Sequence, residues 1–465
     1  MATLTFGQQL KQTALVFALG LGMVCIPAHP SRSEAASINL DRDQSILLGR
    51  ELLADNKTDI ALALARALIA RDPQDPDALV LMAAALQQSG KHKEARKSAR
   101  DAFTASTTEH QKYESAMLVG RSDFHGRAYM RSQYWLRRAA QAAPDPQARQ
   151  AAERNFRYVK RVNPLRLRFS AGVKSSSNVN GGTSADTINL FGLPFQINQG
   201  SRALSGTEYA LDFDLRYRLA QTKKGETALT AEMESRTYSL SSDSRRKAPN
   251  ARASDYSFQR MEVGLARRFT PGSGKGVYEI AGAVGRIWYG GKTTSDYTSL
   301  SLSHGFQLFP ATGARLSFSV DRQIRHNSAA RAAYVYELEG QVAHEFSNKD
   351  RMIFLGSLKQ TDADVSYIRN TALSADLIYS MAKPVFGVRF SPTVGLEQRR
   401  YPDDIYQNTS RRDLTKRLGI AASFDNVEYL GFSPTLHVEF SDTESNVSIH
   451  ERQSLDVFLK INSRF

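Results

Sequence analysis

Apolar and polar side chains alternate along Tyr209-Ala210-Leu211-Asp212-Phe213-Asp214-Leu215-Arg216-Tyr217-Arg218-Leu219. Every odd position is apolar or aromatic, and most even positions are charged. A period of two places the odd and even side chains on opposite faces of a β-strand. The segment therefore predicts a strand with one apolar and one charged face.

The same alternation recurs through the C-terminal two thirds of the chain, for example along residues 333–347 and 451–465. Strands of soluble sandwiches usually have five or six residues, whereas these segments have ten or more. Long strands that are apolar outside and polar inside are typical of membrane-spanning barrels. Because lipid offers no partner for backbone groups, such a sheet has to close on itself.

We predict a 14-stranded antiparallel transmembrane β-barrel over residues 164–465. The expected strands are 165–173, 207–220, 226–239, 255–269, 276–289, 295–309, 313–326, 333–347, 350–361, 366–381, 386–400, 412–426, 432–442 and 451–465. Connections after even-numbered strands are short, and those after odd-numbered strands are mostly longer, above all 174–206 and 240–254. This asymmetry is typical of outer-membrane barrels, with short turns in the periplasm and long loops outside.

The N-terminal residues 1–35 have the features of a secretory signal peptide. Lys11 supplies a positive charge, residues 13–26 are apolar, and small residues suitable for cleavage include Ala28 and Ala35. Cys25, the single cysteine, lacks the small neighbours of a lipidation site, so we interpret it as part of the apolar segment. One cysteine also excludes a disulfide framework and a multi-thiolate metal site.

Residues 36–163 are rich in Ala, Leu and Arg and have helical periodicity. Small residues recur at a spacing of 34, pairing Gly49 with Ala83, Ala61 with Ala95 and Ala65 with Ala99. This is the period of tetratricopeptide repeats, whose small side chains let paired helices approach closely. We predict two such repeats, a looser third over 111–143 and a capping helix over 146–162; a generic helical bundle is the alternative.

A three-repeat stack presents a concave groove lined by the first helix of each pair. The residues expected on that face, and thus the candidate client-binding residues, are Arg50, Gln87, Gln88, Glu114 and Arg121.

The chain carries 61 basic and 47 acidic residues, a formal charge of +14, with a mean hydropathy of −0.40. After residue 30 the longest apolar run is 78–86, far below the roughly 20 residues of a membrane-spanning helix. Residues 36–163 have 21 basic and 15 acidic side chains, and 164–465 have 38 and 31. Because neither part concentrates the charge, nucleic-acid binding is disfavoured, and lipopolysaccharide phosphates are a better partner for the basic residues.

Two motifs carry a resemblance to a known family. Pro164-Leu165-Arg166-Leu167-Arg168-Phe169 is followed by Ser176-Ser177-Asn178-Val179-Asn180-Gly181-Gly182-Thr183, and Leu190–Phe195 and Arg202–Gly206 lie downstream. This arrangement resembles the surface lipoprotein assembly modulator (Slam-like) family, also described as type XI secretion. In that family a periplasmic tetratricopeptide domain precedes a fourteen-stranded barrel. In the family an Asp-Ser-Asn-Ile-Asn-like motif follows the first strand. Ser176 and Val179 stand here where that motif has Asp and Ile, which leaves open a divergent branch with a different client.

The resemblance implies an outer-membrane translocon that moves a lipoprotein or related secreted protein to the cell surface. Its helical domain would engage the client or a periplasmic chaperone, and the barrel would form the route. Phe465, an aromatic that ends the last strand, looks like the signal read by the outer-membrane barrel assembly machinery.

The alternation predicts which charges line the barrel lumen and hydrate a path. They are Asp212, Asp214, Arg216, Arg218, Glu232, Glu234, Arg236, Glu337 and Glu339. The loop 174–206 is long enough to fold inward as a plug or gate. Its candidate residues are Asn178, Asn180, Phe191 and Pro194, the two asparagines because Asn readily anchors turns. If a client leaves sideways, the seam between the first and last strands is the candidate exit.

The sequence favours no catalytic, metal or cofactor site. It has no Gly-x-Ser-x-Gly motif, and its histidines after residue 35 are isolated. Two other functions stay open: an exporter of polysaccharide, since such barrels also carry tetratricopeptide repeats, and a passive porin. Charged rather than aromatic lumen faces disfavour the first, and a helical domain of this size disfavours the second.

Overall fold

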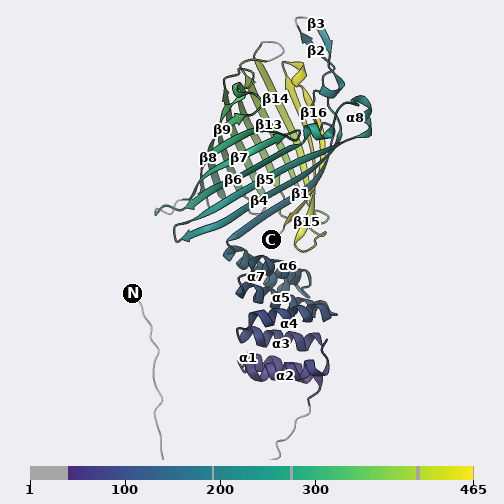
Figure 1. Ribbon diagram of the computed structural model, residues 1–465, viewed down its shortest axis with the longest axis vertical. Helices are drawn as coiled ribbons and strands as arrows, with labels where there is room; N and C mark the ends of the chain where they lie inside the picture. The colour runs from purple at the N-terminus through teal and green to yellow at the C-terminus, as the bar shows by residue number, and fades with distance from the viewer. Residues whose placement is uncertain (1–39, 191–192, 273–275, 405–408, 464–465) are drawn as a thin grey trace, which may run out of the picture.

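The computed structural model describes residues 40–190, 193–272, 276–404 and 409–463. The predicted signal peptide (1–35), Phe191 and Phe465 lie outside the described residues. In the described residues, seven helices form a column that stands against one end of a barrel (Figure 1). Among those residues, no helix is both long enough and apolar enough to cross a membrane.

The seven helices form antiparallel neighbours in chain order. They are α1 (Arg42–Ala54), α2 (Thr58–Arg71), α3 (Pro76–Gln88), α4 (His92–Ala105), α5 (Glu109–His125), α6 (Tyr129–Gln141) and α7 (Pro146–Val162). Asp75 and Asp145 accept hydrogen bonds from the first free amides of α3 and α7, and Pro76 and Pro146 open those helices. A side-chain acceptor and a proline at these positions are local signals that start a helix.

Small residues fill the contacts between the helices, as the spacing of 34 predicted. Ala61, Ala65, Ala83, Ala95 and Ala99 are fully buried. Their small side chains allow the close helix packing of tetratricopeptide repeats, and the predicted repeat architecture is confirmed. The capping helix α7 covers the end of the stack with Phe156 and Val159.

Fourteen strands of the described residues close into an antiparallel barrel in which each strand pairs with its neighbours in the chain. They are β1 (Leu165–Ser176), β4 (Gly206–Thr222), β5 (Gly225–Leu240), β6 (Phe258–Phe269), β7 (Val277–Tyr289), β8 (Lys292–Phe309), β9 (Thr312–Arg325), β10 (Ala333–Glu345), β11 (Arg351–Ala363), β12 (Asn370–Ser380), β13 (Val388–Tyr401), β14 (Arg411–Phe424), β15 (Phe432–Ser445) and β16 (Arg452–Ser463). β1 meets β16 and closes the ring. The predicted strand number and antiparallel topology are confirmed.

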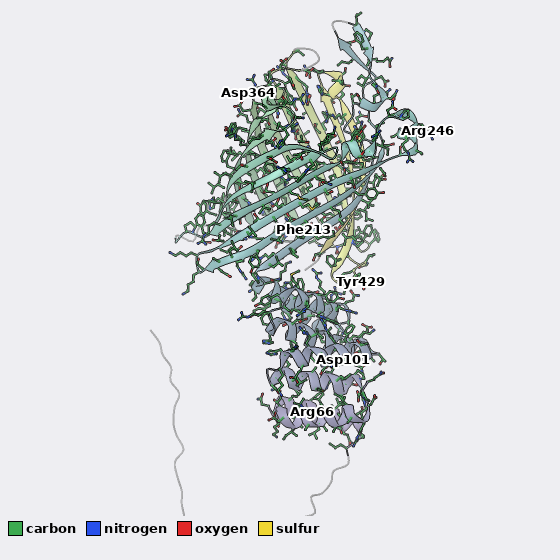
Figure 2. The ribbon with its side chains drawn as sticks, viewed as in Figure 1. Arg66, Asp101, Phe213, Arg246, Asp364 and Tyr429 are labelled. Carbon is green, nitrogen blue, oxygen red and sulfur yellow. The ribbon has the colours of Figure 1, made fainter. Side chains whose placement is uncertain are left out.

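The outer wall of the barrel is apolar. Tyr209, Leu211, Tyr217 and Leu219 of β4 are 43–55% exposed, whereas the alternate residues face inward. Figure 2 shows Phe213 midway along this wall and Tyr429 at the end that faces the helices. An exposed apolar wall around a polar interior fits a bilayer as solvent.

The two barrel ends differ, as predicted. The two longest connections, 177–205 and 241–257, lie at the end away from the helices, which we call the loop end (Figure 1). The alternation is incomplete, because β7 and β8 are joined at the loop end by residues 290–291 alone. The longer connections contain elements that the sequence did not predict. These are the hairpin of β2 (Thr187–Leu190) and β3 (Leu193–Gln196), the helix α8 (Ser242–Lys247) and the 3₁₀ turns η1 (Gln199–Ser201), η2 (Ala253–Tyr256), η3 (Ala329–Arg331) and η4 (Ser448–His450).

Candidate functional site: groove, lumen and junction

A groove between α1, α3 and α5 holds a cavity of about 250 Å³. Its floor is apolar and consists of Leu53, Val80, Leu81, Ala84, Met117 and Leu118, and its edges are Arg50, Tyr113, Glu114 and Arg121. Three of the five predicted groove residues, Arg50, Glu114 and Arg121, therefore lie together. An apolar floor with charged edges suits an extended peptide whose side chains alternate in polarity.

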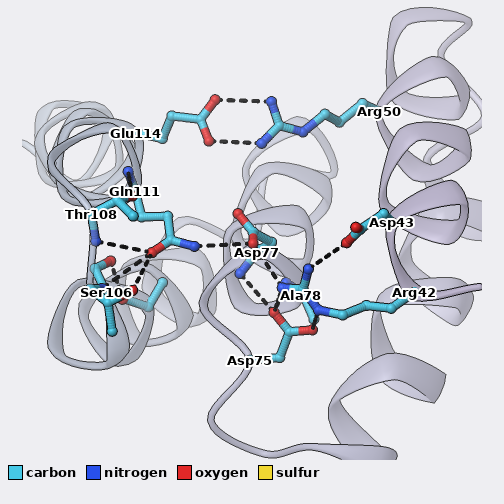
Figure 3. Close-up of polar contacts among 12 residues, drawn as sticks. Arg42, Asp43, Arg50, Asp75, Asp77, Ala78, Ser106, Thr108, Gln111 and Glu114 are labelled. Carbon is cyan, nitrogen blue, oxygen red and sulfur yellow. Dashed lines mark hydrogen bonds and ion pairs between the residues drawn. The ribbon is translucent and has the colours of Figure 1, made fainter. Parts of the chain in front are cut away.

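An ion pair crosses this groove from α1 to α5. The Arg50 guanidinium donates two hydrogen bonds, of 3.1 and 2.8 Å, to the two Glu114 carboxylate oxygens (Figure 3). His110 Nε2 lies 3.5 Å from the same carboxylate. Arg121, on the other side of the floor, forms no ion pair within the described residues. Of the two arginines that edge the groove, Arg50 is paired with Glu114, and Arg121 is available to pair with an anionic group of a bound partner.

Beside this pair, a second network fixes α1 against α3. Arg42 donates to both Asp75 oxygens, at 2.7 and 2.5 Å, and Gln111 donates to Asp77 (Figure 3). Burial raises the pKa of Asp75, but the hydrogen bonds from Arg42 and from the Ala78 amide outweigh it, and the net pKa lies below its ordinary value. The carboxylate stays charged and holds the groove wall in place.

The other two predicted groove residues have different surroundings. Gln88 Nε2 donates to Asn56 Oδ1 at 2.7 Å and to the Leu53 carbonyl at 3.2 Å. Gln87 Nε2 lies 3.5 Å from the Ser122 hydroxyl. Neither lines the cavity; both join neighbouring repeats.

The predicted lumen charges gather in two cavities of the inner wall. One, of about 340 Å³, is lined by Asp212, Asp214, Glu232, Glu234 and Arg236 together with Arg168, Ser170, Met233, Arg260 and Lys460. The other, of about 220 Å³, includes Glu337 and Glu339 with Glu279 and Arg315. Most of these charges are paired, as Arg168 is with Asp214 at 2.8 Å and Arg236 with Asp212 at 2.7 Å.

The two other residues predicted to line the lumen, Arg216 and Arg218, have different contacts. Arg216 lies within 3.3 Å of Glu226 and 3.2 Å of Glu279, so it belongs to the inner network. Arg218 instead donates to the Val162 carbonyl at 2.6 Å. Its role is to tie the barrel to the end of α7.

The loop that follows β1 is anchored by the two predicted asparagines. Asn178 Nδ2 donates hydrogen bonds to the Gly182 carbonyl and to the Gln453 carbonyl of β16. Asn180 Nδ2 donates to the Arg202 carbonyl, and Asn180 Oδ1 accepts a hydrogen bond from the Leu204 amide. The β2–β3 hairpin, with Pro194, projects away from the barrel at the loop end (Figure 1). The β2–β3 hairpin therefore does not enter the barrel, and the role of the loop as a plug or gate stays a prediction. The hydrogen bond from Asn178 to β16 runs across the seam.

No sequence pattern predicted the junction that joins the helices to the barrel. Arg137 of α6 donates to the Leu430 carbonyl and to the Ser463 hydroxyl, each at 2.8 Å, and stacks on Phe432 at 4.5 Å. Arg149 of α7 and Glu428 form an ion pair at 2.5 Å. These contacts fix the groove-bearing domain to β15 and β16, at the mouth of the lumen.

The fold and the two sites define a class of protein: an outer-membrane barrel that carries a tetratricopeptide-type domain at one mouth. The sequence model of the family described as "surface lipoprotein assembly modifier" matches residues 381–465. This match covers β13 to the end of the chain, whereas the motifs that suggested the family surround β1. The resemblance to the surface lipoprotein assembly family is confirmed, and with the barrel it supports an outer-membrane location.

Solved structures resemble each part separately. The Sgt2 TPR domain from Aspergillus fumigatus is 20% identical over 26% of this chain and 77% of its own, with a TM-score of 0.23. A bacterial polysaccharide outer membrane secretin (9% identity) and a BenF-like porin from Pseudomonas fluorescens Pf-5 (8%) each cover 64% of this chain and 98% of their own, with TM-scores of 0.34. These scores are too low to support a functional argument. No curated protein matches the chain.

Proposed function

We propose that this chain is an outer-membrane translocon that moves a lipoprotein, or a related secreted protein, from the periplasm to the cell surface. The family match carries the proposal. The helical domain would lie in the periplasm, because the short barrel turns are on its side. In this role the chain is a conduit and not a catalyst.

The groove supports a client-binding role for the helical domain. Its apolar floor would receive apolar side chains of an extended client segment, and Arg121 would pair with a client carboxylate. The same surface suits a periplasmic chaperone that delivers the client. Because Arg137 and Arg149 fix the domain at the lumen mouth, a bound segment would be released close to the entrance.

The lumen supports passage of a polar chain. Its paired charges of both signs provide hydration without a large net potential that would hold a client of either sign. Around the barrel, exposed basic loops would meet lipopolysaccharide phosphates, and the barrel assembly machinery would insert the chain into the membrane.

Comparative surface proteomics tests the proposal. Intact cells of the native host, with and without this gene, are treated with protease, and the released peptides are quantified. We expect one or a few lipoproteins to disappear from the surface and to accumulate in the periplasm. Complementation with Arg121→Glu should restore less surface display than complementation with Arg66→Glu, which alters an exposed arginine of α2 outside the groove.

An unchanged surface proteome under conditions that express the gene would overturn the proposal. A simultaneous loss of surface polysaccharide would then favour the polysaccharide exporter, and a change in small-solute uptake alone would favour the porin.

A further inference from the structure

Two arginines are register partners on the outer wall of the barrel. Arg400 of β13 and Arg412 of β14 lie directly opposite each other on these neighbouring strands. Each lies an even number of residues from a leucine of its own strand that is exposed on the apolar wall, Leu396 (51%) and Leu418 (61%). Because alternate residues of a strand share a face, both arginines point outward, and both are exposed. Directly opposed side chains begin about 5 Å apart, so two cationic groups are held close together outside the lumen.

Other cations at this end of the outer wall have partners within the protein. Arg286 of β7 donates hydrogen bonds of 2.5 and 3.0 Å to the two Asp296 carboxylate oxygens on β8. Lys416 of β14 lies 2.5 Å from Glu444 on β15. Like charges in directly opposed positions destabilise a sheet, so the arginine pair is an exception that calls for a counter-charge.

The described residues do not supply that counter-charge. Arg400 donates a hydrogen bond of 3.0 Å to the neutral Gln398 side chain, and neither arginine forms an ion pair with another described residue. The main-chain amide of Arg412 donates to Asn446 Oδ1 at 2.7 Å, which is again a neutral group. Residues 405–408, in the connection between β13 and β14, lie outside the described residues, but their sequence is Ile-Tyr-Gln-Asn and includes no carboxylate. A bound anion is therefore the simplest source of the counter-charge.

The pair lies beyond the apolar band, toward the loop end. On β13 the last apolar residue of the outer face is Leu396, and Gln398 and Arg400 follow it on the same face. Four residues span about 13 Å along a strand, or about 10 Å along the membrane normal at the tilt of a membrane barrel. The headgroup layer on each side of the hydrocarbon is about 5–8 Å thick. Arg400 and its partner Arg412 therefore lie at the height of lipid headgroups, where phosphate groups are found.

We propose that Arg400 and Arg412 together bind a phosphate group of lipopolysaccharide in the leaflet at the loop end. This inference deepens the proposed function and rests on its membrane orientation, in which the loop end faces outward. A phosphate monoester carries about −1.5 to −2 charge at pH 7 and three acceptor oxygens, so one group can bridge two guanidinium forks. Bridging replaces the repulsion between the arginines by the attraction of both to one anion. An ordinary phospholipid offers only a singly charged diester, which suits two cations less well.

Binding of lipid A, the phosphorylated lipid part of lipopolysaccharide, tests the site. Full-length protein in detergent micelles is titrated with bisphosphorylated lipid A, and the complexes are quantified by native mass spectrometry. Arg400→Gln combined with Arg412→Gln should weaken binding about tenfold, because charge-assisted hydrogen bonds are lost. The matched control is Arg286→Gln combined with Arg322→Gln, which removes the same charge from the same end of the outer wall. Since Arg286 has a carboxylate partner and Arg322 lies 5.6 Å over the Tyr334 ring, this control should change the affinity little.

Lipid A without its phosphate groups isolates the contact itself. The natural chain should bind this lipid about tenfold more weakly than the bisphosphorylated form, whereas the variant that lacks Arg400 and Arg412 should bind both forms almost equally. Such a coupling between ligand group and side chains identifies the phosphate as their partner. Inorganic phosphate and phosphatidylglycerol are then added at the concentration of the bound lipid A. Neither should displace it, because the first has no acyl chains and the second has no phosphate monoester.

Three outcomes would overturn the site. They are equal loss of binding in the two double variants, natural-chain binding that does not depend on the phosphate groups, and displacement by inorganic phosphate or phosphatidylglycerol. Heat-dependent mobility of the folded barrel on gels shows that each variant is folded. The assay does not depend on secretion in cells: phosphate-dependent binding with an unchanged surface proteome would refute the translocon alone, and the reverse result would refute the lipopolysaccharide site alone.

Discussion

The helical domain and the barrel bury opposite kinds of side chain. In the helical domain most buried residues are apolar, such as Ala65, Ala99 and Leu86, and most charges lie outside, with the paired Asp75 and Asp123 as buried exceptions. In the barrel, Leu300 and Leu418 are each 61% exposed while charged residues line the interior. The same hydrophobic effect therefore builds a close-packed centre in water and an apolar outer wall in lipid.

Placing a charged side chain on the outer wall should cause the largest loss of folding stability. Leu300→Arg in the middle of β8 should destabilise the folded barrel by about 2–4 kcal/mol, because the guanidinium would face hydrocarbon. Urea unfolding in phospholipid vesicles measures the change. The matched control is the next residue, Ser301→Arg, whose side chain enters the cavity beside Glu279, Glu337 and Glu339. Equal stability of the two variants would contradict the assigned orientation of β8.

A smaller effect is expected from overfilling the close-packed part. A Cβ on Gly120 of α5 would lie 2.9 Å from Leu136 Cγ, so Gly120→Val should cost the helical domain about 1–3 kcal/mol. Thermal unfolding followed by helical circular dichroism of the full chain measures the loss. Gly340→Ala in β10 is the control, since an added Cβ there meets no atom within 4 Å. A stable Gly120→Val variant would show that the helices are not close-packed at this contact.

At the junction, the apolar-centred helical domain meets the polar-centred barrel. Arg137→Ala removes two hydrogen bonds and the stacking on Phe156 and Phe432, and should weaken docking of the domain by about 1–2 kcal/mol. Limited proteolysis near residues 162–165 should become faster. Arg157→Ala, which loses only an ion pair within α7, should leave the cleavage rate unchanged. Equal rates for both variants would mean that Arg137 does not hold the domain in place.

The smallest expected effect is a dependence of helical-domain stability on pH. Burial, and then the charge of the stacked His125, lower the pKa of His92. The folded domain therefore disfavours the protonated imidazole, and stability should fall as the pH drops below the ordinary histidine pKa of about 6.5. The loss of stability is measured from unfolding temperatures at neutral and mildly acidic pH, for both the natural chain and the His92→Gln variant. The variant should lose less stability on acidification; an identical loss would assign the effect to other groups.

Local patterns in the sequence predicted the elements well. Alternation placed the last strand at 451–465, where β16 runs from Arg452 to Ser463, and helical periodicity placed the last helix at 146–162, the bounds of α7. These predictions succeed because each strand or helix faces two distinct environments along its whole length. For the same reason the lumen side of Asp212 and Glu234 followed from their positions alone.

Contacts between distant residues could not be predicted from such patterns. Arg137 and Ser463 are far apart in the chain, and neither residue stands out in its own segment. Gln87 and Gln88 lie on the expected helix, but their side chains turn to Ser122 and Asn56 instead of the cavity. The pairing of β1 with β16 depends on how the whole sheet closes, which no single strand encodes.

The attachment of the helical domain has a consequence for the permeability of the membrane. α7 continues through Asn163 and Pro164 into β1, and Arg137 donates a hydrogen bond to Ser463 on β16, so the helical domain is joined to both strands that close the ring. Separating these two strands at the end that faces the helices would also require that contacts outside the barrel break. Closure of the sheet, and with it the barrier to solutes through the barrel wall, is thus stabilised in part by a domain that lies outside the barrel.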